Sequence, residues 1–255
     1  MIYLNFLKNK INKLLNRSIF QEEKFFYYLN QKKRAKLIKL STISNSQLGQ
    51  DLFVLDKLNF KSNGFFVEFG ACDGKLLSNT FLLEKKFNWT GILCEPSRYY
   101  IKNLKKNRSC HIENKCVYSV TGKNLLFIDS KLKELSFINN FRPVDKFLKM
   151  DQYLLNRKAV NKYIVKSISI NDLLKKYNCP KVFEYLSIDT EGTEYEIIKN
   201  LNFSQFRPKI ITIEHNYNAP LRNNIYNLLI EQNYKRVLTK FSKWDDWYIN
   251  KTTIK

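Results

Sequence analysis

Short apolar runs alternate with amphipathic stretches along the chain from about Ser46 onwards. The apolar runs are rich in Val, Ile, Leu and Phe, which is typical of strands covered on both faces. The stretches between them carry apolar residues at helical spacing. Strands alternating with helices of this length predict an α/β domain with a mostly parallel, doubly wound sheet.

The predicted elements follow one another in a regular order. Strands are expected in the run into Gly70 and at 91–95, 111–117, 123–129, 182–189, 209–214, 234–240 and 247–250. Helices are expected at 47–58, from about 79, and at 99–106, 194–201 and 223–232, and the stretch 167–174 predicts a strand that enters a capped helix. Residues 130–162 have weaker periodicity, and we interpret them as an insertion that shapes a substrate pocket.

The N-terminal residues differ from the rest. Apolar residues recur at helical spacing between Leu4 and Leu15 with lysines between them, and a second helical stretch covers about 22–40. We therefore divide the chain into a basic helical appendage, 1–45, and a catalytic domain, 46–255. Three interpretations of the appendage stay open: a cap on the domain or on a second subunit, a basic face on anionic lipid, or a partly disordered arm.

The net charge of +21 changes this picture little. It suggests nucleic-acid binding, but lysine far outnumbers arginine, the residue best suited to phosphate and base contacts. The charge is also spread along the chain, with one concentration of +8 in residues 1–40. We therefore expect no nucleic-acid partner.

Cysteine usage and hydropathy suggest a compartment. Five cysteines, without a Cys-x-x-Cys pair, argue against a disulfide framework or a zinc knuckle. No apolar run approaches the roughly 20 residues needed to span a bilayer, and the N-terminus lacks a convincing signal peptide. The expected location is the cytoplasm, with contact at the inner face of the membrane left open.

The most informative motif is a glycine-containing turn. The segment Glu68-Phe69-Gly70-Ala71-Cys72-Asp73-Gly74 follows an apolar run and precedes Ser78-Asn79 at the start of a predicted helix. Glycines at such a turn let the backbone approach a nucleotide closely. The next strand ends at Glu95-Pro96, 21 positions after Gly74, where an acid can accept ribose hydroxyls. Because the pyrophosphate-binding Gly-x-Gly-x-x-Gly is absent, the pattern favours S-adenosylmethionine over NAD.

Two later strands also end in polar clusters. Asp189 and Glu191 follow one strand, and Glu214 and His215 follow the next. Ligands of open parallel sheets bind beyond the carboxyl ends of the strands, so these four residues are candidates for catalysis. Methyl transfer to an alcohol needs a base or a metal, because a hydroxyl is about as weakly acidic as water. Asp189, Glu214 and His215 form a set suited to magnesium, manganese or calcium. Alternatively, His215 is the base. Glu191 is a competing base or a third ligand.

Each of these residues also has a structural alternative. Asp189 could cap the next helix and Glu191 could lie in its first turn. Glu214 could pair with a surface lysine, His215 could be a hydrogen-bonded core residue, and Asp73 could be a turn residue.

At these positions the chain resembles the FkbM family of S-adenosylmethionine-dependent methyltransferases. The resemblance runs from about Ser46 to Tyr248, and its segments occur in order: 46–51, 66–74, 78–80, 91–96, 185–194, 213–216 and 244–248. It implies a Rossmann-like class I methyltransferase fold and, usually, O-methylation of a sugar hydroxyl in capsule, lipopolysaccharide or related glycan biosynthesis.

The resemblance also assigns roles to residues. It implies that Glu68, Gly70, Asp73, Gly74 and Glu95 hold the cofactor, with Ser78 and Asn79 nearby, and that Asp189, Glu191, Glu214 and His215 face the acceptor. The acceptor would be a sugar, a nucleotide sugar or a glycan, and a homodimer stays open. Two alternatives remain: an RNA or protein methyltransferase, which the acidic strand ends disfavour, and a cofactor-binding module without catalysis.

Overall fold

The computed structural model describes residues 25–26, 28–29, 31–141 and 155–252. Its centre is a seven-stranded sheet in the order β10-β11-β9-β8-β1-β2-β3. Five strands are parallel, whereas β11 runs antiparallel to both β9 and β10. The strands are β1 (Phe65–Phe69), β2 (Thr90–Cys94), β3 (His111–Glu113), β8 (Val182–Ile188), β9 (Arg207–Glu214), β10 (Tyr234–Val237) and β11 (Asp245–Asn250). The predicted Rossmann-like, doubly wound fold is confirmed.

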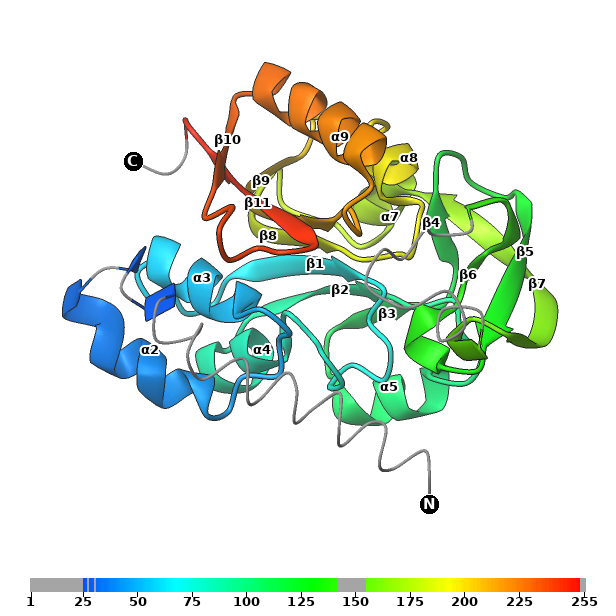
Figure 1. The fold of residues 1–255 in the computed structure, drawn as a ribbon, viewed down its shortest axis with the longest axis horizontal. Helices are drawn as coiled ribbons and strands as arrows, with labels where there is room; N and C mark the ends of the chain where they lie inside the picture. The colour runs from blue at the N-terminus through cyan, green and yellow to red at the C-terminus, as the bar shows by residue number, and fades with distance from the viewer. Residues whose placement is uncertain (1–24, 27, 30, 142–154, 253–255) are drawn as a thin grey trace.

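Helices cover both faces of this sheet (Figure 1). One face carries α7 (Ile170–Lys176), α8 (Glu194–Ile198) and α9 (Ala219–Glu231); the other carries α2 (Arg34–Ser41), α3 (Gln50–Lys57), α4 (Phe81–Phe87) and α5 (Ile101–Asn107). Successive side chains of β1 enter opposite cores, with Val67 and Phe69 on one face and Phe66 on the other. This explains why β1 is apolar throughout.

A second, four-stranded sheet lies beside the first, in the order β4-β7-β5-β6. It consists of β4 (Cys116–Tyr118), β5 (Asn124–Ser130), β6 (Phe137–Ile138) and β7 (Ala159–Ser169), with short turns η2 (Lys133–Leu135) and η3 (Asn139–Phe141).

The predicted strand at 111–117 is therefore wrong as a single element. It bends at Asn114 and Lys115 and contributes β3 to one sheet and β4 to the other. The strand before α7 begins earlier than predicted, because one face of β7 is open to solvent and its first residues are not uniformly apolar. Ser169 caps α7 as expected, its side chain accepting from the Asp172 backbone N–H.

The described part of the predicted appendage packs on the domain. Phe25, Phe26, Leu29 and Leu37 are buried in the same cluster as Trp247. The predicted helix between Leu4 and Leu15 lies outside the described residues, as does much of the 22–40 stretch before η1 (Gln31–Lys33). Among the described helices, none has the length and apolar character needed to cross a bilayer.

At Gly70 the chain after β1 packs closely against the chain after β8. Its φ is +79°, and a Cβ there would overlap the Asp189 carbonyl oxygen. Gly122 has a similar φ of +87° but open space around it. We expect Gly122→Ala to cost about 1–2 kcal/mol of unfolding free energy from backbone strain alone, and Gly70→Ala to cost clearly more. Equal losses in denaturant unfolding would contradict this packing.

Candidate functional site

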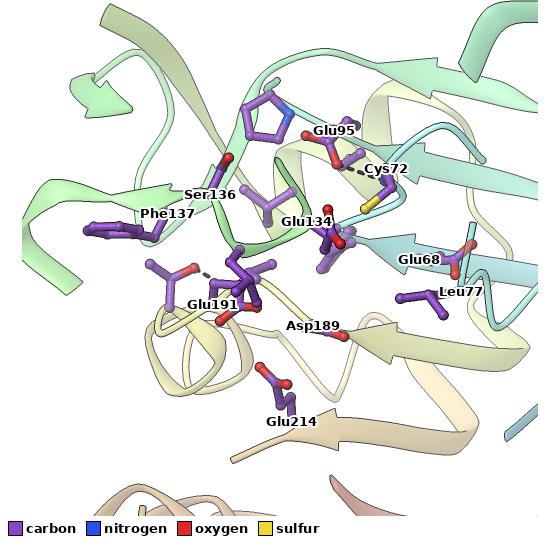
Figure 2. Close-up of a pocket in the computed structure, with 18 of the residues that line it drawn as sticks. Glu68, Cys72, Leu77, Glu95, Glu134, Ser136, Phe137, Asp189, Glu191 and Glu214 are labelled. Carbon is purple, nitrogen blue, oxygen red and sulfur yellow. Dashed lines mark hydrogen bonds between the residues drawn. The ribbon is translucent and has the colours of Figure 1, made fainter. Parts of the chain in front are cut away.

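A cavity of about 230 Å³ opens at the carboxyl ends of β1, β2, β8 and β9, with the small sheet forming a further wall (Figure 2). It lies where the strand order reverses on either side of β1, the place where ligands of open α/β sheets bind. Of the predicted site residues, it is lined by Glu68, Gly70, Asn79, Glu95, Pro96, Asp189, Glu191 and Glu214.

The turn after β1 is tied to its neighbours by backbone hydrogen bonds. The N–H groups of Gly70 and Ala71 donate to the Cys94 carbonyl, and the Asp189 N–H donates to the Phe69 carbonyl. Main chain therefore forms the floor of the cavity, and the glycine at position 70 is required by the close approach of Asp189.

Glu95 lies at the end of β2 and is 5% exposed. Its Oε2 accepts from the Cys72 N–H at 2.8 Å and its Oε1 from the Ser97 N–H at 2.8 Å. Burial raises the pKa of this carboxyl to about 7, against the opposing effect of the two N–H donors. Each oxygen keeps acceptor capacity for a further donor, such as a ribose hydroxyl.

Glu68 is more fully engaged by the protein itself. Its carboxylate accepts from the Ser78 hydroxyl, the Asn79 N–H and the Thr80 hydroxyl, and Arg108 Nη1 lies 3.6 Å away. These contacts fix the turn that precedes α4. The Asn79 side chain then donates to Ser187 Oγ, while its buried Oδ1 has no hydrogen-bond partner in the structure as described.

The structure separates three predicted cofactor residues from the cavity. Asp73 accepts from the Lys75 and Leu76 N–H groups, which is the turn role left open by the sequence. Gly74 faces Leu104 and Arg108, which a Cβ would meet at 2.6 Å, and Ser78 bonds to Glu68. None of the three lines the cavity. The motif spacing identified the turn but could not tell which of its residues face inward.

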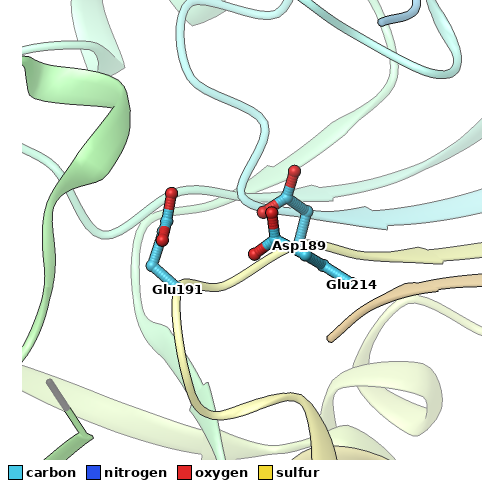
Figure 3. A group of neighbouring side chains, drawn as sticks. All are labelled: Asp189, Glu191 and Glu214. Carbon is cyan, nitrogen blue, oxygen red and sulfur yellow. The ribbon is translucent and has the colours of Figure 1, made fainter. Parts of the chain in front are cut away.

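Asp189, Glu191 and Glu214 converge at the other end of the cavity (Figure 3), with carboxylate oxygens within 4.8 Å of one another. Burial and the neighbouring carboxylates raise the pKa values of Asp189 and Glu214 well above their ordinary range. Because their oxygens lie close together, these two acids titrate as a pair and not independently. The alternatives that made Asp189 a helix cap and Glu214 a partner of lysine do not hold: Thr193 occupies the cap position of α8, and Glu214 accepts from the Asn216 side chain.

His215 does not join this group, which corrects the predicted metal set of Asp189, Glu214 and His215. Its Nδ1 accepts from the Tyr217 N–H, and its Nε2 lies 3.8 Å from Asp246 Oδ1, away from the cavity lining. Burial lowers the pKa of the imidazole to about 4. Successive residues of an extended strand point to opposite faces, so Glu214 at the end of β9 faces the cavity and His215 faces the other side. Glu191 takes its place beside the two acids.

Sequence reasoning missed several residues of the cavity. Arg157, at 3% exposure, pairs with Glu191 through a 2.7 Å contact. Gln47 and Trp244 form another wall and are hydrogen-bonded to each other. Gln47 and Trp244 lie in segments that carry the family resemblance, which was the available signal. Arg157 gave none, because its surroundings have weak periodicity.

The cavity is strongly acidic although the chain is basic. Six carboxylates line it against one lysine and one arginine. A cation that carries hydrogen-bond donors, such as S-adenosylmethionine with its sulfonium, ammonium and ribose hydroxyls, matches this lining and the unpaired oxygen of Asn79. The acids also form an oxygen-rich group of the kind that hard divalent cations prefer.

The raised pKa of Glu95 leads to a pH dependence of stability. An unfolded glutamate has a pKa near 4.5, so between about 4.5 and 7 the folded state binds the extra proton. Stability is therefore lost as pH rises through this window, and Asp245, with a pKa also raised to about 7, acts in the same direction. We expect the Tm of the ligand-free protein to rise when pH falls from 8 to 6. Glu95→Gln should flatten this rise, whereas Asp73→Asn, outside the cavity, should leave it intact; a Tm that falls over this range would contradict it.

Comparison with known proteins gives a family match. The profile described as the methyltransferase FkbM domain matches residues 68–236. No curated protein matches the chain.

Solved structures resemble it at low identity. A methyltransferase FkbM from Methylobacillus flagellatus KT has a TM-score of 0.49 and 13% identity. The match covers 91% of this chain but only 59% of that protein. A precorrin-6y C5,15-methyltransferase from Geobacter metallireducens GS-15 has a TM-score of 0.39 and 11% identity over 78% of this chain and 84% of the other. A fibrillarin/Nop5p complex has a TM-score of 0.38 and 11% identity over 80% and 79%. Because the family profile spans more than half of the residues and includes the strand-end acids, the chain belongs to the methyltransferase FkbM domain family.

Proposed function

We propose that this protein is an S-adenosylmethionine-dependent O-methyltransferase that acts on a sugar hydroxyl in glycan biosynthesis. The observation that carries the proposal is a close pair of acids with raised pKa values, half-buried Asp189 and buried Glu214, in one cavity with Glu95. Membership of the methyltransferase FkbM domain family supports it.

The cofactor end of the cavity is the turn after β1 together with the end of β2. Gly70 would allow main chain to approach the adenosine, Glu95 would accept the ribose hydroxyls, and Asn79 Oδ1 would accept from the amino-acid tail. When bound, S-adenosylmethionine supplies an electrophilic methyl group on a sulfonium. Every other requirement of the reaction falls to residues of this chain.

The main chemical requirement is removal of a proton from the acceptor. An alcohol is about as weakly acidic as water, so its oxygen becomes an effective nucleophile only as a base takes the proton. In the proposed reaction, bound S-adenosylmethionine would supply the methyl group for the acceptor oxygen, and the Asp189–Glu214 pair would take the hydroxyl proton. Acids with raised pKa values are stronger bases when ionised, which suits them to this role.

A divalent cation would be a second way to activate the hydroxyl. The sequence predicted a magnesium, manganese or calcium site on Asp189, Glu214 and His215, and the presence of such an ion stays a prediction. Because His215 lies outside the group, we propose Asp189, Glu191 and Glu214 as its ligands. Added chelator separates the two routes, because a base made of carboxylates alone would be insensitive to it.

The acceptor class follows from the same charges. A nucleic-acid acceptor would bring phosphates to a cavity lined by six carboxylates, which disfavours the RNA alternative. A sugar, a nucleotide sugar with its phosphates outside the cavity, or a glycan of a capsule or lipopolysaccharide stays the proposed acceptor. Contact with the inner face of a membrane through the N-terminus, a cytoplasmic location and a homodimer likewise stay predictions.

The proposal is tested by transfer of labelled methyl groups to a panel of nucleotide-activated sugars, with and without EDTA. Asp189→Asn and Glu214→Gln keep the shape of each side chain but remove the base. We expect each to lower kcat by roughly 10²–10⁴-fold, the usual contribution of a general base, while cofactor affinity changes little.

Two further variants serve as controls in that assay. Glu95→Ala should weaken cofactor binding, because it removes the acceptor of the ribose hydroxyls. Glu113→Gln changes a strand-end acid that pairs with Lys176 outside the cavity, and it should leave turnover unchanged. Full activity of both Asp189→Asn and Glu214→Gln, in either presence or absence of chelator, would refute the assignment.

A further inference from the structure

Arg157 connects two walls of the cavity. Its side chain is buried, and its guanidinium lines the cavity between them. The Nη1 atom donates to the Leu135 carbonyl at 2.9 Å, and the Nη2 atom donates to Glu191 Oε2 at 2.7 Å. Leu135 ends η2 on the side of the small sheet, whereas Glu191 follows β8 of the central sheet. One side chain therefore bridges the insertion and the loop that carries the acids.

The wall on the insertion side is a continuous stretch from Lys133 to Ile138, all of whose residues line the cavity. It is anchored near Arg157, since the Leu132 N–H donates to the Asn156 carbonyl and Ser130 Oγ donates to the Leu135 carbonyl. The stretch meets both ends of the cavity: Glu134 lies near Cys72 and Glu95 beside the turn after β1 (Figure 2), whereas Leu135 accepts the hydrogen bond from Arg157. The part around Leu135 is therefore the part that an acceptor next to the acid group would meet.

A second close approach joins the same two segments. Gly192 has a φ of +118°, and a Cβ there would overlap the Phe141 carbonyl oxygen at the end of η3. The loop after β8 thus meets the insertion twice, at Glu191 through Arg157 and at Gly192 through main chain. Together, these two contacts fix the distance between the insertion side of the cavity and the acids.

Arg157 also distinguishes among the three acids. Glu191 is held by a guanidinium in a buried, charge-assisted hydrogen bond, whereas Asp189 and Glu214 lie against each other. The geometry therefore ties Glu191 to Arg157 and leaves Asp189 and Glu214 side by side in the lining of the cavity.

We propose that Arg157 is a positioning residue that holds the 133–138 wall against the loop after β8 and keeps Glu191 ion-paired, so that the acceptor hydroxyl faces Asp189 and Glu214. The kinetic consequences of this proposal rest on the proposed function. The Arg157 clamp, by which we mean its two hydrogen bonds to Leu135 and Glu191, is a property of the fold. Only a planar fork reaches the carbonyl and the carboxylate at once, so lysine is not an equivalent substitute.

The test compares Arg157→Gln, Arg157→Lys, Glu191→Gln and the double variant Arg157→Gln/Glu191→Gln. We expect Arg157→Gln to lower kcat/KM for the acceptor by roughly 10²-fold, as small misplacements of reacting groups do. Arg157→Lys should recover only part of this loss, and cofactor Kd should change less than kcat/KM for the acceptor, because Arg157 binds Leu135 and Glu191 and not Glu95 or Asn79. The double variant should be no worse than Arg157→Gln, because no buried charge is left unpaired.

A readout independent of catalysis separates this proposal from the proposed function. Hydrogen exchange of Arg157→Gln should show loss of protection in 131–138 while β1 and β8 stay protected. Arg207→Lys, a change to an arginine that binds backbone carbonyls at the start of β9, is the matched control and should alter neither readout. If the wild-type protein methylates no sugar but the exchange result is as expected, the proposed function is refuted and the positioning role of Arg157 is still supported. Unchanged exchange in 131–138, or equal loss of cofactor and acceptor binding, overturns the clamp.

Discussion

The site depends on one electrostatic constraint: several carboxylates are buried together at one edge of a parallel sheet. Asp189, Glu214 and Glu95 all have raised pKa values, and for each of them burial is the largest cause. Charges of like sign in a poorly solvated cavity must be neutralised by a proton, a cation or an ion pair. Arg157 supplies the ion pair for Glu191, the raised pKa values of Asp189, Glu214 and Glu95 favour their protonated forms, and a cationic methyl donor would take over part of that task.

The fold brings this about by simple means. Parallel strands place their carboxyl ends along one edge, and the acids that follow β1, β2, β8 and β9 are brought together there. The close approach of Gly70 to the Asp189 carbonyl and the positive φ at Glu191 and Asn216 then direct individual side chains inward or outward. Strain of this kind concentrates at functional sites, because the surrounding packing holds it in place.

The sequence was informative where local pattern determines structure. The strands leading into Gly70, Glu95, Asp189 and Glu214 were predictable because each is an apolar run ended by polar residues, and that pattern is set by burial on both faces. It failed where direction depends on backbone conformation. His215 follows Glu214 directly, so it points to the opposite face of the strand end and lies near Asp246. Arg157 could not be found, because its partners Leu135 and Glu191 are distant in sequence and no periodicity links them.

Proton release on cofactor binding is the most direct measurement of the central electrostatic claim. Titration calorimetry of the wild-type protein near pH 7, in phosphate and in Tris, reports protons released from the difference in binding heat. We expect S-adenosylmethionine to release protons from the carboxyls with raised pKa values, and the product S-adenosylhomocysteine, which lacks the sulfonium charge, to release fewer. Identical heats in the two buffers, or no binding at all, would contradict the view that buried acids in this cavity await a cation.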